Sequence, residues 1–247
     1  MNKPSLPPID ILKVVWISMC ASIATIVLFI PITAAALASS TGNLAFTLSK
    51  LWAFFMLKAT RVKVTIRNRE KMRRGAQYVI ISNHQSMYDI LALVTSLGLQ
   101  FRWIIKKELR GIPLFGYALY VSRNIFIDRS DSGKAIESIH RGMDRLPPGT
   151  SVMFFAEGTR SSGNAIGEFK KGGFIMALEK GFPILPVTVN GSRRVLPGKS
   201  LVFNPGTIEV VVGNPIDAAD FSRDTLKDLI DQTREVIVRN FRPHCPA

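Results

Sequence analysis

The stretch YVIISNHQSMYDILALVTSLG, residues 78–98, decides the fold. Its first four residues, 78–81, form a continuous apolar run, which is typical of a strand buried on both faces of a sheet. Residues 89–97 predict a helix that ends at Gly98. A buried strand that leads into a helix is the building unit of α/β proteins. The polar residues between these two elements are therefore expected at the sheet edge where such folds place their functional sites.

The chain beyond residue 60 continues this alternation. Strands are expected at 61–67, 101–105, 125–127, 152–155, 184–189, 201–203 and 208–212. Helices are expected at 114–121, 132–146, 173–180 and 222–239, the last with Ser222 as its N-cap. Strands alternating with helices in this way predict an α/β fold with a central mixed sheet flanked by helices.

The composition limits the classes of protein and partner. The 247 residues include 32 Lys and Arg against 18 Asp and Glu, a net charge of +14. Such a basic chain favours an anionic partner, namely nucleic acid, an anionic membrane surface or a phosphorylated substrate. The two cysteines, Cys20 and Cys245, sit near opposite ends, and the three histidines share no metal-ligand spacing. These features exclude a disulfide framework and a His/Cys zinc site.

The first 60 residues indicate a membrane. No charged residue occurs between Lys13 and Lys50, and residues 14–38 are mostly apolar. About 20 such residues suffice to span a bilayer, and Pro31 is expected to kink the helix rather than to forbid it. Residues 44–57 are too few to cross upright but suit an interfacial helix. We therefore expect a two-helix hairpin that anchors the protein to one leaflet.

Three other interpretations of this segment stay open. The first is a single membrane span followed by an interfacial helix, and the second is a buried helical hairpin of an ordinary core. The third is a signal peptide cleaved after Ala36-Leu37-Ala38, although the apolar run exceeds a usual signal core. The anchoring hairpin divides the chain into a membrane-associating part, residues 1–59, and an α/β catalytic domain, residues 60–247.

The segment Asn83-His84-Gln85-Ser86-Met87-Tyr88-Asp89 carries the first candidate chemistry. On one straight helix, His84 and Asp89 would point about 140° apart. They meet if His84 lies in the turn after the strand and Asp89 lies in the first helical turn. The carboxylate would then fix the imidazole tautomer and leave the second ring nitrogen as a general base. Because no G-x-S-x-G motif supplies a serine, the hydroxyl is expected from the substrate. The alternative is a structural histidine.

Cations follow two further strands. Arg129 lies two residues past strand 125–127, where its planar guanidinium suits a phosphate; a surface ion pair with Asp128 is the alternative. Glu157-Gly158-Thr159-Arg160 leaves strand 152–155 through a glycine turn. There Glu157 is expected to hold a substrate hydroxyl and Arg160 a phosphate, unless the segment is simply a polar loop.

Together, in this order, these segments resemble the glycerolipid acyltransferase family, most closely the bacterial 1-acyl-sn-glycerol-3-phosphate (lysophosphatidic acid) acyltransferases. The matching residues are Asn83, His84 and Asp89, then Lys107-Glu108-Leu109, Pro113-Leu114-Phe115-Gly116 and Phe126-Ile127-Asp128-Arg129, then Phe155-Ala156-Glu157-Gly158-Thr159-Arg160-Ser161 and Pro186-Val187. The chain departs from the family pattern at Arg123, where glycine is usual, and at Ala156, where proline is usual.

The resemblance implies transfer of a fatty acyl group to the free sn-2 hydroxyl of lysophosphatidic acid, which gives phosphatidic acid. The donor would be an acyl thioester of acyl carrier protein or of coenzyme A. His84 would act as the general base, oriented by Asp89. The residues that would seat the glycerol phosphate are Arg129, Glu157, Gly158, Thr159 and Arg160. No metal and no other cofactor is implied.

The resemblance also implies a place in the cell, the bacterial inner membrane with the catalytic domain on the cytoplasmic face. Membrane lipid is then a partner, and nucleic acid is not. A nucleic-acid-binding module would account for the positive charge but not for the uncharged stretch between Lys13 and Lys50. Two enzymatic alternatives stay open, namely an acyltransferase that uses glycerol-3-phosphate or another lysolipid, and a membrane-bound lipid hydrolase.

Overall fold

The computed structural model describes residues 7–73, 75–128, 130, 132–161, 165–198 and 200–243. Seven strands form one sheet in the order β1-β7-β6-β2-β5-β3-β4. They are β1 (Val62–Arg67), β2 (Val79–Ser82), β3 (Phe101–Lys106), β4 (Ile125–Ile127), β5 (Ser151–Phe155), β6 (Ile184–Asn190) and β7 (Gly206–Val212). Strands β6 and β7 pair antiparallel and the other neighbours pair parallel, so the predicted mixed sheet is confirmed.

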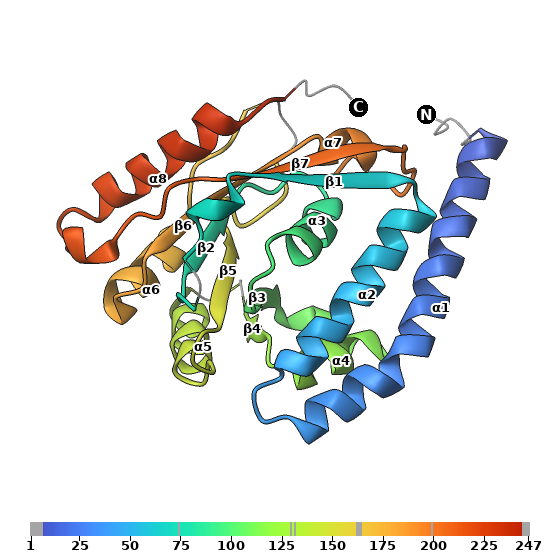
Figure 1. Ribbon diagram of the computed structural model, residues 1–247, viewed down its shortest axis with the longest axis horizontal. Coiled ribbons are helices and arrows are strands. Elements are labelled where there is room, and N and C mark those ends of the chain that lie inside the picture. The colour runs from blue at the N-terminus through green and yellow to red at the C-terminus, as the bar shows by residue number, and fades with distance from the viewer. Residues whose placement is uncertain are drawn as a thin grey trace.

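Helices cover both faces of the sheet, as predicted (Figure 1). The α-helices are α1 (Pro8–Ala38), α2 (Asn43–Ala59), α3 (Tyr88–Ser96), α4 (Phe115–Val121), α5 (Ser132–Asp144), α6 (Gly172–Lys180), α7 (Ser192–Val195) and α8 (Leu226–Asn240). Short 3-10 helices are η1 (Arg69–Lys71), η2 (Lys107–Gly111) and η3 (Ala218–Asp220). Helices α5, α6 and α8 pack on one face, and α3 packs on the other together with α2.

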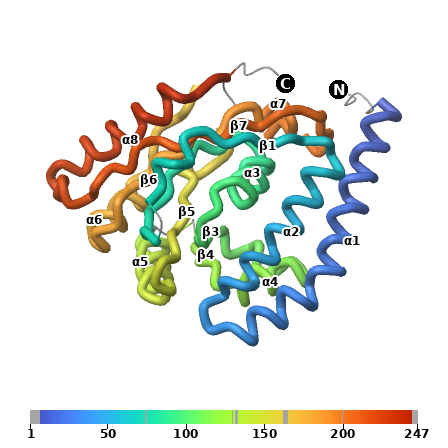
Figure 2. The backbone as a smooth tube through the Cα atoms, viewed as in Figure 1, coloured from blue at the N-terminus to red at the C-terminus, as the bar shows by residue number. Residues whose placement is uncertain are grey.

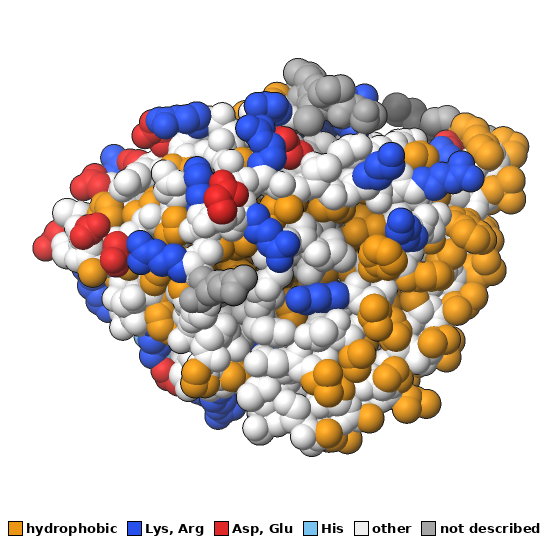
Figure 3. Space-filling model, in the orientation of Figure 1, with side chains coloured by type: hydrophobic (Ala, Val, Ile, Leu, Met, Phe, Trp, Pro, Cys, Tyr) orange, Lys and Arg blue, Asp and Glu red, His pale blue; other side chains and the backbone are white. Residues whose placement is uncertain are grey.

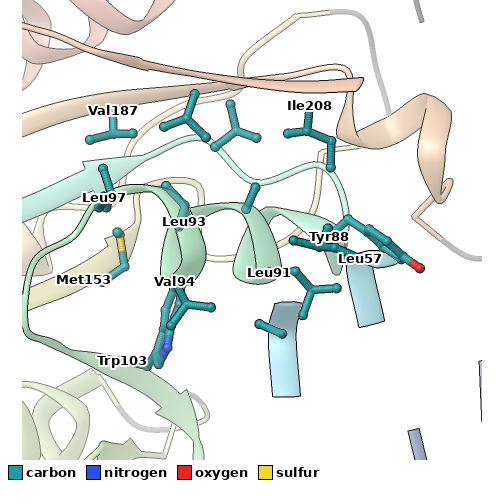
Figure 4. Close-up of a cluster of buried hydrophobic side chains, with 14 of the residues drawn as sticks. Leu57, Tyr88, Leu91, Leu93, Val94, Leu97, Trp103, Met153, Val187 and Ile208 are labelled. Atoms are coloured by element: carbon teal, nitrogen blue, oxygen red, sulfur yellow. The ribbon is translucent and has the colours of Figure 1, made fainter. Parts of the chain in front are cut away.

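Strand β2 lies near the middle of the sheet and is buried on both faces, as its apolar run predicts. Ile80 belongs to the cluster on the α3 side, and Val79 and Ile81 belong to the cluster on the opposite side. Figure 4 shows the α3 side, where Leu93 of that helix and Leu97 directly after it lie beside side chains of neighbouring strands. Burial of each such side chain contributes about 1.5–3 kcal/mol, so this layer fixes α3 on the sheet.

One predicted strand, at residues 201–203, is wrong. The segment is irregular, and the chain just after it is tied to α7, since the Asn204 amide donates to the carbonyl of Val195 (2.8 Å). The reason is topological. Strand β7 already has β1 on one edge and β6 on the other, so no edge is left for a hairpin partner.

The predicted start of the last helix is also wrong, because α8 begins at Leu226 and Ser222 is not its N-cap. Ser222 belongs to a separate turn, in which its backbone N–H donates to Thr225 Oγ1 (2.8 Å) and its hydroxyl accepts from the Asp224 N–H (3.2 Å). Serine side chains commonly form such local bonds in competition with helix capping.

Helices α1 and α2 run side by side along one flank of the molecule (Figure 2). Figure 1 shows α1 curving over its C-terminal part, which contains Pro31. Hydrophobic side chains gather over these two helices on the visible surface (Figure 3), and Ile30 is 73% exposed. Among the described residues, α1 is the one helix long and apolar enough to cross a membrane.

A buried arginine ties the turn of this hairpin to the sheet. Arg102 of β3 is fully buried, and its Nη2 donates to the Thr41 carbonyl and to Asn43 Oδ1, both at 2.7 Å. Its guanidinium also lies 5.4 Å from the ring centre of Phe46 in α2. Burial, with a smaller contribution from the charge of Arg123, lowers the pKa of Arg102 to about 10. The group therefore stays charged at neutral pH while it holds the turn.

Replacing this arginine should loosen the hairpin. Arg102→Met removes both donors to the turn, and charge-assisted hydrogen bonds are worth about 1.5–3 kcal/mol. We expect the Tm of the detergent-solubilised chain to fall by roughly 3–12 °C. Arg141→Met is the matched control, because Arg141 forms an exposed pair with Glu137 that contributes little. Equal melting temperatures for the two variants would show that Arg102 does not secure the turn.

Candidate active site

The end of β2 and the start of α3 bring His84 and Asp89 together. His84 lies in the turn after the strand, and Asp89 lies in the first turn of the helix. The distance from His84 Nδ1 to Asp89 Oδ2 is 2.8 Å, and the two side chains are 13% and 0% exposed. Because the carboxylate accepts, Nδ1 carries the proton, and Nε2 of a neutral ring is left as the basic nitrogen.

Asp89 also determines the shape of the turn in front of it. Besides the imidazole, its Oδ2 accepts the backbone N–H groups of Gln85 (2.7 Å) and Ser86 (2.9 Å). A carboxylate in the first turn of a helix also interacts favourably with the helix dipole. One buried oxygen therefore starts α3, closes the turn and orients the ring of His84.

The imidazole is held from its face by aromatic rings. The ring centres of His84 and Phe155 are 3.8 Å apart with an interplanar angle of 11°. Phe155, from the end of β5, stacks in turn on Trp103 of β3, with 5.6 Å between ring centres. This stack restricts rotation of the imidazole and surrounds it with apolar surface.

Glu157 fixes the same loop from the neighbouring strand. Its Oε1 accepts the backbone N–H of His84 (3.1 Å), and its Oε2 accepts the backbone N–H of Gly167 (2.9 Å). In return, the His84 carbonyl accepts the backbone N–H of Ser161 (2.8 Å). The carboxylate is buried, and it joins the loop after β2 to the loop after β5. Sequence reasoning missed this structural role, because it depends on the parallel pairing of β2 with β5.

Two further polar side chains hold the turn, and the sequence alone predicted no separate role for either of them. Asn83 donates through Nδ2 to the Val189 carbonyl (2.9 Å) and accepts the Val189 N–H (2.8 Å), so it extends the pairing of β2 with β6. Ser86 donates its hydroxyl to the Leu196 carbonyl (2.8 Å). Both are fully buried, and buried polar groups require such partners. The signals in the sequence are their place between a buried strand and a helix and, for Asn83, its match to the family pattern.

The other predicted site residues line a groove of about 1270 Å³ at the end of β5. Gly158 turns the chain with a φ of +71°, and Thr159 and Arg160 after it are exposed. Lys170 and Lys171 also line the groove, and together with Arg160 these cations outnumber the carboxylates of Glu157 and Glu168 in its lining. Phe155 reaches the groove as well, which places the imidazole stack at its border. Such a groove suits an anionic group.

Arg129 lies outside the described residues, but its neighbour Asp128 is described. Asp128 Oδ2 contacts Lys107 Nζ at 2.5 Å, and its Oδ1 accepts the Ser130 N–H at 3.0 Å. The Lys107 contact, followed by the bonds from Ser130, holds the pKa of the Asp128 carboxyl well below its usual range. Asp128 is thus ionised and paired with a lysine of η2.

An apolar cavity of about 110 Å³ lies between the hairpin and the sheet, lined by side chains of α1, α2, α3 and α4. Trp103 forms part of its wall. Since Trp103 stacks on Phe155 and Phe155 on His84, the aromatic stack reaches from this cavity to the groove. The apolar cavity and the groove are therefore linked by the stacked rings of Trp103 and Phe155, and His84 packs on the second of these rings. Within the described ranges, no three His, Cys, Asp or Glu side chains gather as a metal site.

An imidazole that a buried carboxylate orients, at the carboxyl edge of an α/β sheet, can act as a general base that accepts a proton from a hydroxyl group. Residues 63–190 match the Acyltransferase family, and the chain belongs to this family.

Individual relatives extend the comparison. The chain is 32% identical over 194 residues to a chloroplastic 1-acyl-sn-glycerol-3-phosphate acyltransferase of Brassica napus, which covers 77% of this chain and 56% of that protein. It is 33% identical over 171 residues to the Pseudomonas aeruginosa enzyme of the same name, covering 68% and 66%. The chain spans about half the length of the chloroplastic relatives that it matches.

A solved structure shares the fold. The crystal structure of the 1-acyl-sn-glycerophosphate acyltransferase PlsC from Thermotoga maritima superposes with a TM-score of 0.80. The match covers 93% of both chains at 21% sequence identity, and it therefore shows that the two proteins share a fold.

Glu157→Gln should loosen the His84 loop. The amide group keeps one acceptor oxygen, so one backbone N–H loses its charged partner and faces an NH₂ group instead. A charge-assisted bond is worth about 1.5–3 kcal/mol, which predicts a roughly 10–150-fold faster exchange of the His84 and Gly167 amide hydrogens. Hydrogen-exchange mass spectrometry measures this, with the exposed Glu168→Gln as the matched control. Unchanged protection in Glu157→Gln would refute the bridging role.

Proposed function

We propose that the protein transfers a fatty acyl group from an acyl thioester to the free sn-2 hydroxyl of 1-acyl-glycerol-3-phosphate, which gives phosphatidic acid. The observation that carries the proposal is the 2.8 Å contact between His84 Nδ1 and Asp89 Oδ2, at the border of the cationic groove. The names of the relatives support the acceptor, since those from plants and bacteria are called 1-acyl-sn-glycerol-3-phosphate acyltransferases.

The pair assigns the proton movements. Asp89 keeps the proton on His84 Nδ1, so Nε2 accepts the proton of the acceptor hydroxyl as its oxygen attacks the thioester carbonyl. The tetrahedral intermediate collapses, the carbon–sulfur bond breaks, and the imidazolium returns the proton to the leaving thiolate. The products are an ester and a free thiol. This route needs no acyl-enzyme, no metal and no other cofactor.

The cationic part of the groove is assigned to the glycerol phosphate. Arg160 is exposed there, next to Thr159, and Lys170 and Lys171 line the same space. We add Arg129, because its match to the family pattern supports the same role. Gly158 gives the loop its turn, and Glu157 holds that loop against His84. Guanidinium groups bind phosphate through paired hydrogen bonds, which orients the acceptor as well as attracting it.

The apolar cavity under the hairpin is assigned to part of an acyl chain. Most of its described wall is formed by apolar and aromatic side chains, among them Leu91, Trp103 and Leu119. The donor would be acyl carrier protein or coenzyme A, both of which are anionic. The excess of Lys and Arg in residues 61–160 would attract either one.

We further propose that residues 1–59 anchor the catalytic domain, residues 60–247, to one membrane leaflet. Helix α1 packs along α2 at two levels, since Trp16 Nε1 donates to the Ala59 carbonyl (2.9 Å) and Trp52 Nε1 to Thr25 Oγ1 (3.1 Å). Because α2 holds α1 along much of its length, we expect α1 to lie on the membrane rather than to cross it. For a bacterial chain, this is the inner membrane with the catalytic domain in the cytoplasm.

A transfer assay tests the function. Detergent-solubilised protein is offered acyl-CoA and acyl carrier protein thioesters, with lysophosphatidic acid, glycerol-3-phosphate and other lysolipids as acceptors. We expect phosphatidic acid from lysophosphatidic acid, identified by mass. Release of free fatty acid without a transfer product would indicate a hydrolase instead. Activity confined to glycerol-3-phosphate or another lysolipid would refute the assigned acceptor.

His84→Ala should lower kcat by at least about 100-fold, because general-base catalysis contributes roughly 10²–10⁴-fold. Asp89→Asn should also lower kcat substantially, since an amide no longer selects the productive tautomer. His140→Ala is the control, because His140 lies on α5 and contacts Glu179 (2.7 Å). The measurement is the steady-state rate on lysophosphatidic acid. A His84→Ala enzyme that keeps more than a tenth of the normal kcat would end the general-base assignment.

Arg160→Ala and Arg129→Ala should each raise the apparent KM for the phosphorylated acceptor. Loss of a charge-assisted contact of about 1.5–3 kcal/mol corresponds to a roughly 10–150-fold rise. The KM for the acyl donor should change far less, which initial rates at varied donor and acceptor concentrations would show. Arg141→Ala, an exposed residue of α5, serves as the control. If neither variant changes the acceptor KM, these arginines do not bind the phosphate.

A further inference from the structure

The segment from η2 through α4 exposes apolar side chains beside the hairpin. We define the α4 surface as the five residues Leu109, Ile112, Leu114, Tyr117 and Tyr120, which are 37–47% exposed. They belong to one short stretch of 12 residues between β3 and β4. Single exposed apolar residues are ordinary, but five in one short segment indicate a surface that meets an apolar environment.

The fold holds this segment in a defined shape. A Cβ atom on Gly116 would collide with the carbonyl oxygens of Leu109 and Arg110, so only glycine lets the two parts of the segment pack. Leu114 has a φ of +59°, a region that leucine rarely adopts, and yet its side chain is directed to the surface. The apolar side chains are thus presented by a built structure.

The α4 surface continues the apolar surface of α1. Ala118 and Val121 of α4 pack against the cluster around Ile32 of α1, and the rings of Phe29 and Tyr117 lie 6.1 Å apart. Figures 1 and 2 show α4 beside the C-terminal part of α1. The exposed side chain of Ile30 belongs to that same part of α1. Any bilayer that covers α1 at this level would therefore also meet α4.

Cations border the same segment. The Arg110 guanidinium lies 4.1 Å from the ring centre of Tyr120. Lys106 lies just before η2 and pairs with Glu108, while Lys107 is the first residue of η2 and contacts Asp128, directly after β4. Apolar side chains bordered by tyrosine and by Lys or Arg match the interface of an anionic bilayer, where hydrocarbon, headgroup and water follow one another.

We propose that the α4 surface is a second membrane contact, which enters the same leaflet as the hairpin and places Arg110 among anionic headgroups. The proposal rests on the membrane anchoring proposed above. Continuity with α1 favours a bilayer over a protein partner. The contact would also position the phosphate site relative to the membrane, because Lys107 of η2 contacts Asp128, the residue directly before Arg129. The acceptor phosphate would then be bound at headgroup level.

Site-specific fluorescence tests the proposal. In a Cys20→Ala, Cys245→Ser background of the full chain, Ile112→Cys is labelled with an environment-sensitive fluorophore. The protein is then reconstituted into vesicles of phosphatidylcholine and phosphatidylglycerol. We expect the emission maximum in vesicles to lie at shorter wavelength than that of the same protein kept soluble by an amphipol in detergent-free buffer. We also expect quenching by lipids that carry a spin label high on the acyl chain. Tyr120→Cys repeats the measurement on α4, in case Ile112→Cys folds poorly.

Two reference positions separate the outcomes. Ile30→Cys on α1 reports the hairpin, and Val238→Cys is an exposed apolar position on α8, a helix that packs on the other face of the sheet from α2. Quenching at positions 30, 112 and 120 but not at 238 is the expected result. Quenching at 30 alone would overturn the second contact and leave the anchor intact, whereas its absence at all four positions would overturn both. A shift at 112 or 120 that requires an acyl carrier protein, or a higher protein concentration without vesicles, would assign the surface to a protein partner and also overturn the proposal.

Discussion

A single buried carboxylate oxygen sets the geometry on which the site depends. Asp89 Oδ2 accepts the imidazole of His84 and the backbone N–H groups of Gln85 and Ser86, all within 2.9 Å. A buried negative charge is tolerated only where such donors surround it. Because the donors come from three consecutive residues, the turn between β2 and α3 is held in one shape. That shape places the ring at the carboxyl edge of the sheet.

The two buried carboxylates at this edge, Asp89 and Glu157, are both stabilised by hydrogen bonds from backbone N–H groups. Asp89 accepts two backbone N–H groups and Glu157 accepts two more, and among the described residues no side-chain cation pairs with Glu157. This division has an electrostatic consequence. Because peptide groups satisfy the carboxylate of Glu157, the nearby Arg160 and Lys170 are not consumed in structural ion pairs among the described residues. Their charge remains for an anion that enters the groove.

The sequence predicted what local pattern controls and missed what depends on topology. The apolar run 78–81 and the helix after it are local features, and they were found, as was the turn that joins His84 to Asp89. The strand expected at 201–203 failed because alternation does not tell whether a neighbouring edge is free. The contact of Glu157 with the His84 N–H and the contacts of Arg102 with the hairpin turn join residues 59 to 73 positions apart, and no spacing rule reports them.

The same long-range contacts connect the membrane side of the molecule to its chemistry. Arg102 holds the turn of the hairpin, and the next residue on β3, Trp103, stacks on Phe155, which stacks on His84. On the proposed function, the acceptor is an amphiphile whose acyl chain stays in the leaflet while its phosphate and hydroxyl must reach the imidazole. An apolar cavity under the hairpin and a cationic groove at the sheet edge meet at this stack. With this arrangement, the hydroxyl of the acceptor lipid would reach the imidazole of His84 while the acyl chain of that lipid stays in an apolar environment.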